Sequence, residues 1–124
     1  MTLQELYERM DGDFEQALRV MRVEKLVDKH IRKLPANHVF ADLKQAAAAN
    51  DPAALFDSAH AIKGVCANLG LKNISESASQ IAEEYRPGNA RTMSDEQVQT
   101  IVSEIDGMYA KAVAAIGEYT GEAA

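Results

Sequence analysis

Residues 52–70, PAALFDSAHAIKGVCANLG, form the stretch whose pattern decides the fold. Asp51 is a good N-cap for a helix, and Pro52 suits the first helical position, where its missing N–H is not needed. Gly70 suits the left-handed position that ends a helix. Between them, apolar residues recur every three or four positions, at Leu55, Ala59, Ile62, Val65 or Cys66, and Leu69. The stretch therefore predicts one complete amphipathic helix.

The same helical spacing extends outward in both directions, and no segment alternates as a strand would. Capping-box spacing at Thr2 and Ser94 marks two further helix starts, and Pro35 marks a helix end. The pattern predicts helices over about residues 3–10, 14–33, 37–49, 71–85 and 95–116. Short connections favour antiparallel neighbours. We therefore expect an all-α fold in which the last four helices form an antiparallel four-helix bundle, with the first two helices packed on it as additional N-terminal helices.

Length and composition limit the class of protein. A chain of 124 residues with 47% hydrophobic residues can bury a core without a metal or a disulfide. We expect a single domain over residues 1–120 and a frayed tail over 121–124, with fraying expected already from Gly117. The net charge of −6 argues against nucleic acid and against an anionic membrane surface as partners. A single cysteine, a charged N-terminal segment and no long apolar run favour a cytoplasmic protein and, in the absence of any contrary sign, a monomer.

His60 lies on the polar side of the predicted 52–70 helix. At about 100° per residue, its side chain points about 160° away from that of Ile62, which belongs to the apolar stripe. Residues three and four positions away share the face of His60. These neighbours are Phe56, Asp57, Lys63 and Gly64, with Ala53 and Ala67 one further turn away.

This face could carry a phosphoryl group. A neutral imidazole is a nucleophile near neutral pH and can hold a covalent intermediate. Lys63 can reach phosphate oxygens, and Gly64 removes a side chain that would crowd the ring. We expect Ala53, Phe56, Asp57 and Ala67 to form a partner-binding surface around them. From these residues alone, a phosphoryl carrier and an ordinary surface histidine remain equally open.

The segment from His60 to Gly70, HAIKGVCANLG, resembles the signature of histidine-containing phosphotransfer domains: His, any residue, an aliphatic residue, Lys, Gly, five variable residues and Gly. The family is also similar in length and in its helical-bundle fold. The resemblance implies that His60 is the phosphoacceptor, that Lys63 steadies the phosphoryl group and that Gly64 gives it room. Some members orient the ring with a glutamine from the next helix. Gln80 is the nearest candidate, with Ala82 in a competing register.

The resemblance further implies a relay role. Such domains accept a phosphoryl group from the aspartyl phosphate of one receiver domain and pass it to another. The implied partners are response-regulator receiver domains and a hybrid sensor kinase. The chain would be a free-standing phosphocarrier and not an enzyme, with no cofactor of its own, and magnesium would be bound only by the partner receiver.

The same residues allow other interpretations. The main alternative is a degenerate member of the family, a non-catalytic adaptor that binds receivers without carrying phosphate. Asp57-x-x-His60 resembles half of a di-iron motif, but the second half is missing. We interpret Cys66 as a small core residue, since it lies about 240° around the helix from His60 and cannot pair with it for hydrolysis. His30 and His38 are interpreted as ordinary residues.

Overall fold

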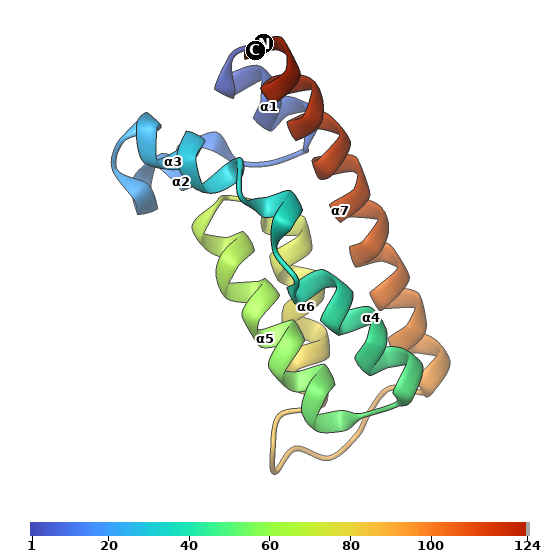
Figure 1. Cartoon of the computed structure of the whole chain (residues 1–124). Helices are drawn as coiled ribbons and strands as arrows, with labels where there is room; N and C mark the ends of the chain where they lie inside the picture. Colours follow the sequence, from blue (N-terminus) through green and yellow to red (C-terminus); the bar gives the residue numbers. More distant parts are fainter. Residues whose placement is uncertain (124) are drawn as a thin grey trace.

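Four long helices lie side by side and form the body of the molecule (Figure 1). In chain order they are α4 (Val39–Ala49), α5 (Pro52–Asn68), α6 (Lys72–Glu84) and α7 (Asp95–Ala123). Each packs against its neighbours in the order α4, α5, α6, α7 and back to α4, which closes a four-helix bundle. The computed structural model describes residues 1–123, and that range contains no strand. The prediction of an all-α fold with an antiparallel four-helix bundle is confirmed.

The core of the bundle is built from the apolar stripes that the sequence predicts. Leu43 of α4, Leu55 and Ile62 of α5, Ile81 of α6 and Ile105 of α7 are each at most 1% exposed. Cys66 is also fully buried, and burial raises the pKa of its thiol to about 12. Because its side chain is fully buried, Cys66 is a small core residue, as predicted.

Side chains fix the helix starts as predicted. The backbone N–H of Ala54 donates to the carboxylate of Asp51 at the start of α5. Ser94 and Gln97 form a reciprocal capping box at the start of α7. Each such cap is worth about 1 kcal/mol. Gly70, in the left-handed region with φ +71°, follows α5 and turns the chain into α6.

Three short N-terminal helices pack on this bundle: α1 (Leu3–Arg9), α2 (Phe14–Met21) and α3 (Glu24–Ile31), followed by the 3₁₀ turn η1 (Leu34–Ala36). Helix α1 lies against α7, and α2 lies against α5. The buried hydroxyl of Tyr7 donates to the carbonyl of Leu69, 2.7 Å away, and the N–H of Asp13 donates to the carbonyl of Gly70 at 2.8 Å. These bonds fasten the N-terminal segment to the end of α5.

The prediction of a single helix over residues 14–33 is wrong. The chain breaks after Met21, because Arg22 adopts the left-handed region with φ 76°, and it restarts at Glu24. The break lets Ala17 of α2 and Val27 of α3 both be fully buried. In one continuous helix these two residues would lie about 15 Å apart along the axis and about 80° apart around it. Helices α2 and α3 instead form a hairpin.

Helix α7 continues past Gly117 to Ala123, so the expected frayed tail is helical as far as the structure describes it, and its fraying stays a prediction. The hydroxyl of Tyr119 donates to Asp28 of α3, and Glu118 forms an ion pair with Arg9 of α1. These contacts hold the last turns against the N-terminal helices. Ala124, the end of the predicted 121–124 tail, lies outside the described residues. Although α7 has 29 residues, neither it nor any other described helix is long and apolar enough to cross a membrane.

Candidate functional site

His60 is exposed in the middle of α5, on the side opposite the buried Ile62. The predicted geometry of the helix places it there, because the stripe that includes Leu55 and Ile62 must face the core. The imidazole therefore projects from the outer face of α5. A second macromolecule can approach it without any movement of the bundle.

The ring of His60 is stacked on that of Phe56, one turn earlier, with ring centroids 5.5 Å apart and planes 16° from parallel. The guanidinium of Arg86, just after α6, lies over the Phe56 ring, 5.5 Å from its centroid. Phe56 is half-buried. The stack restricts the orientation of the imidazole, and the cation over Phe56 is attracted by the negative face of that ring.

Positive charge gathers around Glu83, which lies on α6 beside the histidine. Arg86 hydrogen-bonds to the Glu83 carboxylate at 2.7 Å. This bond, together with the charges of Arg86, Lys63 and His60, lowers the pKa of Glu83 against the opposing effect of desolvation. Glu83 and Arg86 were not singled out from the sequence. Their spacing of three residues just before Pro87 was the available signal, since such pairs form on one helix face.

Lys63 is half-buried and is held at its backbone. The hydroxyl of Ser75, on α6, donates to the carbonyl oxygen of Lys63 at 3.1 Å. The ammonium group of Lys63 has no ion-pair partner among the described residues. It is therefore available to an anion brought to His60 from outside.

Gly64 leaves open space one turn beyond His60. A Cβ atom built on it would meet no other atom within 4 Å, and the residue is exposed. The absence of a side chain is therefore not required for packing inside this molecule. It leaves the surface next to the imidazole without a projecting side chain.

The residues predicted to bind a partner share this outer surface. Ala53, Asp57 and Ala67 are exposed, and Phe56 supplies the aromatic face described above. Asp57 also lines a groove of about 550 Å³ between α4 and α5. Their role in partner binding stays a prediction.

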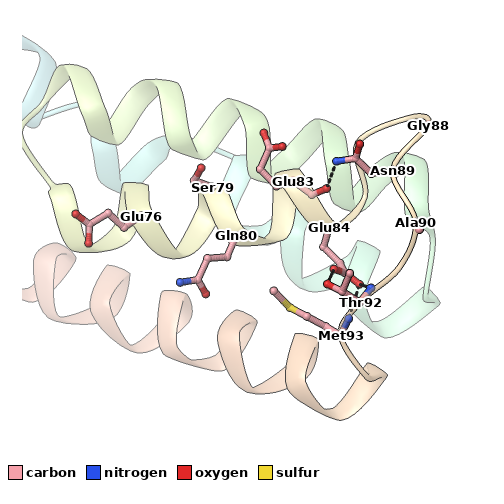
Figure 2. A pocket seen from close by; sticks show the side chains of 10 residues that line it. All are labelled: Glu76, Ser79, Gln80, Glu83, Glu84, Gly88, Asn89, Ala90, Thr92 and Met93. Atoms are coloured by element: carbon pink, nitrogen blue, oxygen red, sulfur yellow. Dashed lines mark hydrogen bonds between the residues drawn. The ribbon is translucent and has the colours of Figure 1, made fainter.

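Gln80 is not directed toward α5, the helix that carries His60. Figure 2 shows its side chain directed toward α7, whereas Ser79 and Glu83 are directed toward α5. Gln80 lines a surface depression of about 770 Å³ with Glu84 and Met93. In the described part of the chain, no hydrogen bond joins Gln80 to His60. The side of α6 that faces α5 thus presents Ser79 and Glu83.

The described residues bring no three His, Cys, Asp or Glu side chains together in a way that could hold a metal ion. His38 lies outside the site, where its Nδ1 is 2.6 Å from a carboxylate oxygen of Asp42. His30 lines a separate pocket beside α3. Their interpretation as ordinary residues stays a prediction.

Comparison with known proteins gives one match. A family model described as Hpt domain matches residues 35–115, which include α4, α5, α6 and most of α7. No curated protein and no solved structure matches the chain.

Proposed function

The chain belongs to the Hpt domain family, which takes part in histidine phosphotransfer in two-component signalling, and from this premise we propose that His60 is its phosphoacceptor. In this proposal, His60 receives a phosphoryl group from the aspartyl phosphate of one receiver domain and passes it to an aspartate of another. Hpt domains are phosphocarriers that interact with response-regulator receiver domains. We expect the phosphorylated receiver to belong to a hybrid sensor kinase.

One observation carries the proposal. His60 is the histidine of the matched region that stands exposed at mid-helix with an unpaired lysine one turn away and open space beyond it. His38, the other histidine within residues 35–115, is engaged with Asp42 at the start of α4. A group that is loaded and unloaded by two proteins must be reachable by both, and His60 meets this requirement.

The proposed step balances without any further reactant. The unprotonated nitrogen of the imidazole, taken here as Nε2, attacks the phosphorus of the aspartyl phosphate. An N–P bond forms, the P–O bond to the aspartate breaks, and the receiver regains its carboxylate. The other ring nitrogen keeps its proton. Transfer to the second receiver reverses these steps, with its aspartate as the nucleophile.

Side chains of this chain assist through charge. Lys63 can attract the phosphate oxygens as a flexible point charge. Phe56 fixes the plane of the ring from which the nitrogen attacks, and Gly64 leaves room for the incoming receiver. In this proposal magnesium is bound by the receiver, and Hpt residues contribute orientation and electrostatic attraction.

The test is direct labelling. The protein is incubated with receiver domains carrying labelled aspartyl phosphate, and acid-labile, base-stable label is measured on the wild type, on His60→Gln and on the matched control His38→Gln. We expect the label to disappear only in His60→Gln. Label that persists in that variant would contradict the role of His60. Receiver binding without any label on the wild type would instead identify a non-catalytic adaptor.

A further inference from the structure

The α2–α3 hairpin projects from one side of the bundle (Figure 1). It precedes residue 35, where the family match begins. Val20, Val23 and Leu26 are 42%, 51% and 39% exposed, and they are the exposed large apolar side chains of the described residues. All three lie within seven positions around the break at Arg22. Exposed apolar clusters of this kind mark interaction sites.

Residues 19–33, which we call the basic hairpin, carry positive charge in an acidic chain. The chain has 13 Lys and Arg residues and a net charge of −6, yet the acidic residues of this segment are only Glu24 and Asp28. The basic residues of the segment are Arg19, Arg22, Lys25, Lys29, Arg32 and Lys33. The net charge of the rest of the chain is therefore more negative than the −6 of the whole.

The cations of the basic hairpin are mostly unpaired. Arg32 is the one of the six with an ion pair among the described residues, to Asp28 at 3.0 Å. Outside the hairpin every described Lys or Arg except Lys63 has a carboxylate within 4 Å. These pairs are Arg9–Glu118, Lys44–Asp106, Lys72–Asp13, Arg86–Glu83, Arg91–Glu84 and Lys111–Asp11. Unpaired positive charge thus lies on the basic hairpin and beside His60.

The surface of the hairpin continues onto the helix that carries the histidine. One face of α3 carries Leu26 and His30, which are four residues apart. Lys33 follows three residues later, just after the helix ends, and continues this face. His30 and Lys33 line a pocket of about 410 Å³ whose opposite wall includes Asn68 of α5. Asn68 lies about two turns beyond His60 and about 80° around the helix. A partner seated over His60 would therefore also reach α3.

We propose that the basic hairpin is a docking element that selects the receiver domain exchanging phosphate with His60. Its partner is a receiver whose surface beside the phosphorylated aspartate is acidic around an apolar centre. The inference rests on the proposed function, because that function brings an aspartyl phosphate to this face. Because five of the six cations of the basic hairpin have no ion pair among the described residues, the surface that complements them is negatively charged. Opposite charges accelerate the encounter, and Val23 and Leu26 would supply apolar contact at its centre.

The experiment uses a panel of isolated receiver domains phosphorylated with acetyl phosphate. It measures kcat/KM for transfer to the wild type, to Lys29→Gln/Lys33→Gln, to Leu26→Ser and to the control Lys44→Gln/Lys111→Gln. The control removes the same charge from exposed positions on α4 and α7. Direct labelling of His60 by phosphoramidate, which needs no receiver, reports whether the histidine itself is intact in each variant.

We expect both hairpin variants to lose about tenfold in kcat/KM with the receivers that are acidic beside their aspartate. We also expect the wild-type rate to fall more steeply with salt than that of the lysine variant, because exposed charges are screened. Labelling by phosphoramidate stays unchanged, and the control stays close to the wild-type rate, because Lys44 and Lys111 lie outside the hairpin.

Equal rates for the hairpin and control variants overturn the inference and leave the proposed function intact. The inference is also overturned if transfer is unchanged but the hairpin variants lose binding to phosphatidylglycerol vesicles, which assigns the hairpin to a membrane. Loss of self-association alone, measured by sedimentation, overturns it too and assigns the hairpin to a second copy of this chain. If no receiver phosphorylates the wild type, the proposed function fails, and this inference fails with it.

Discussion

At the scale of single residues, two glycines of one helical segment have opposite roles. Gly70 is required by the fold: its φ is +71°, and a Cβ there would lie 2.1 Å from the carbonyl oxygen of Asp13. Gly64 is not, because a Cβ there would meet nothing within 4 Å. Glycine inside a helix costs about 1 kcal/mol relative to alanine. The chain accepts this cost beside His60, where the proposed function requires a partner to come close.

Gly64→Ala should therefore raise the free energy of unfolding by about 1 kcal/mol and still slow phosphotransfer, because the new methyl group stands where the receiver approaches. Gly107→Ala is the matched control: Gly107 is exposed within α7, and a Cβ there also meets nothing within 4 Å. Chemical denaturation and receiver-to-protein transfer measure the two effects. Equal transfer rates in both variants would show that Gly64 has no role in access.

At the scale of elements, one buried carboxylate holds the loop between α6 and α7. Glu84, at the end of α6, accepts hydrogen bonds from the backbone N–H groups of Thr92 and Met93 and from the Thr92 hydroxyl (Figure 2). It also accepts one from the guanidinium of Arg91. Burial by itself would raise the pKa of Glu84, but these bonds outweigh it and lower the pKa to about 2. The carboxylate of Glu84 thus holds the loop to the end of α6.

Glu84→Gln should lower the free energy of unfolding by about 2 kcal/mol at neutral pH, because a neutral amide has only one oxygen for four donors. Since the folded-state pKa is depressed, the stabilisation by Glu84 is complete above its ordinary pKa. It is lost as the pH falls from about 4.5 toward about 2. Thermal unfolding across this range, with the exposed Glu76→Gln as control, should show the difference between wild type and variant shrinking. A difference independent of pH would contradict the ionised state.

Sequence patterns predicted the elements better than their breaks. The helix starts at Thr2, Asp51 and Ser94 are confirmed because capping depends on residues three positions apart. The break at Arg22 was missed, since an arginine with positive φ has no local signature. The sequence does contain one indirect sign of the break. The apolar residues Met21 and Val23 are two positions apart, where a helix would space them by three or four. Helix α2 packs on α5, far along the chain, and such a contact leaves no mark in local spacing.

At the candidate site, too, spacing within one helix predicted some features and could not predict others. The exposure of His60 and the open side at Gly64 followed from helix geometry on one element, so they could be derived from spacing. The positions of Arg86 and Glu83 depend on the register between α5 and α6, which spacing within one helix does not determine. For that reason Gln80 was selected from the sequence, although it is directed toward α7 (Figure 2).

At the scale of the whole molecule, the C-terminal part of α7 contacts the N-terminal helix α3. The Tyr119 hydroxyl donates to Asp28, and the guanidinium of Arg32 lies 5.0 Å from the centroid of the Tyr119 ring. The hydrogen bond from Tyr119 is the main cause that lowers the pKa of Asp28. Helix α7 thus spans the bundle and carries the hairpin at its far end.

Tyr119→Phe should loosen the basic hairpin without unfolding the bundle, because it removes one hydrogen bond to a carboxylate and keeps the ring. Hydrogen exchange should become faster in α3, residues 24–31, and stay unchanged in α5. Uniformly faster exchange in both helices would mean that the hairpin and the bundle open together as one unit.

If His60 is the phosphoacceptor, as proposed, its exposed position on a single helix face also determines how phosphoryl groups pass through the molecule. A single exposed ring cannot be covered by two receivers at once, so donor and acceptor must take turns, and we expect double-displacement kinetics with parallel double-reciprocal plots. Each receiver then competes with the other for the same face. An excess of unphosphorylated acceptor receiver would occupy the face around His60 and slow rephosphorylation of His60 by the donor. The ratio of the two receivers would thus regulate throughput, and their relative phosphorylation would set its direction.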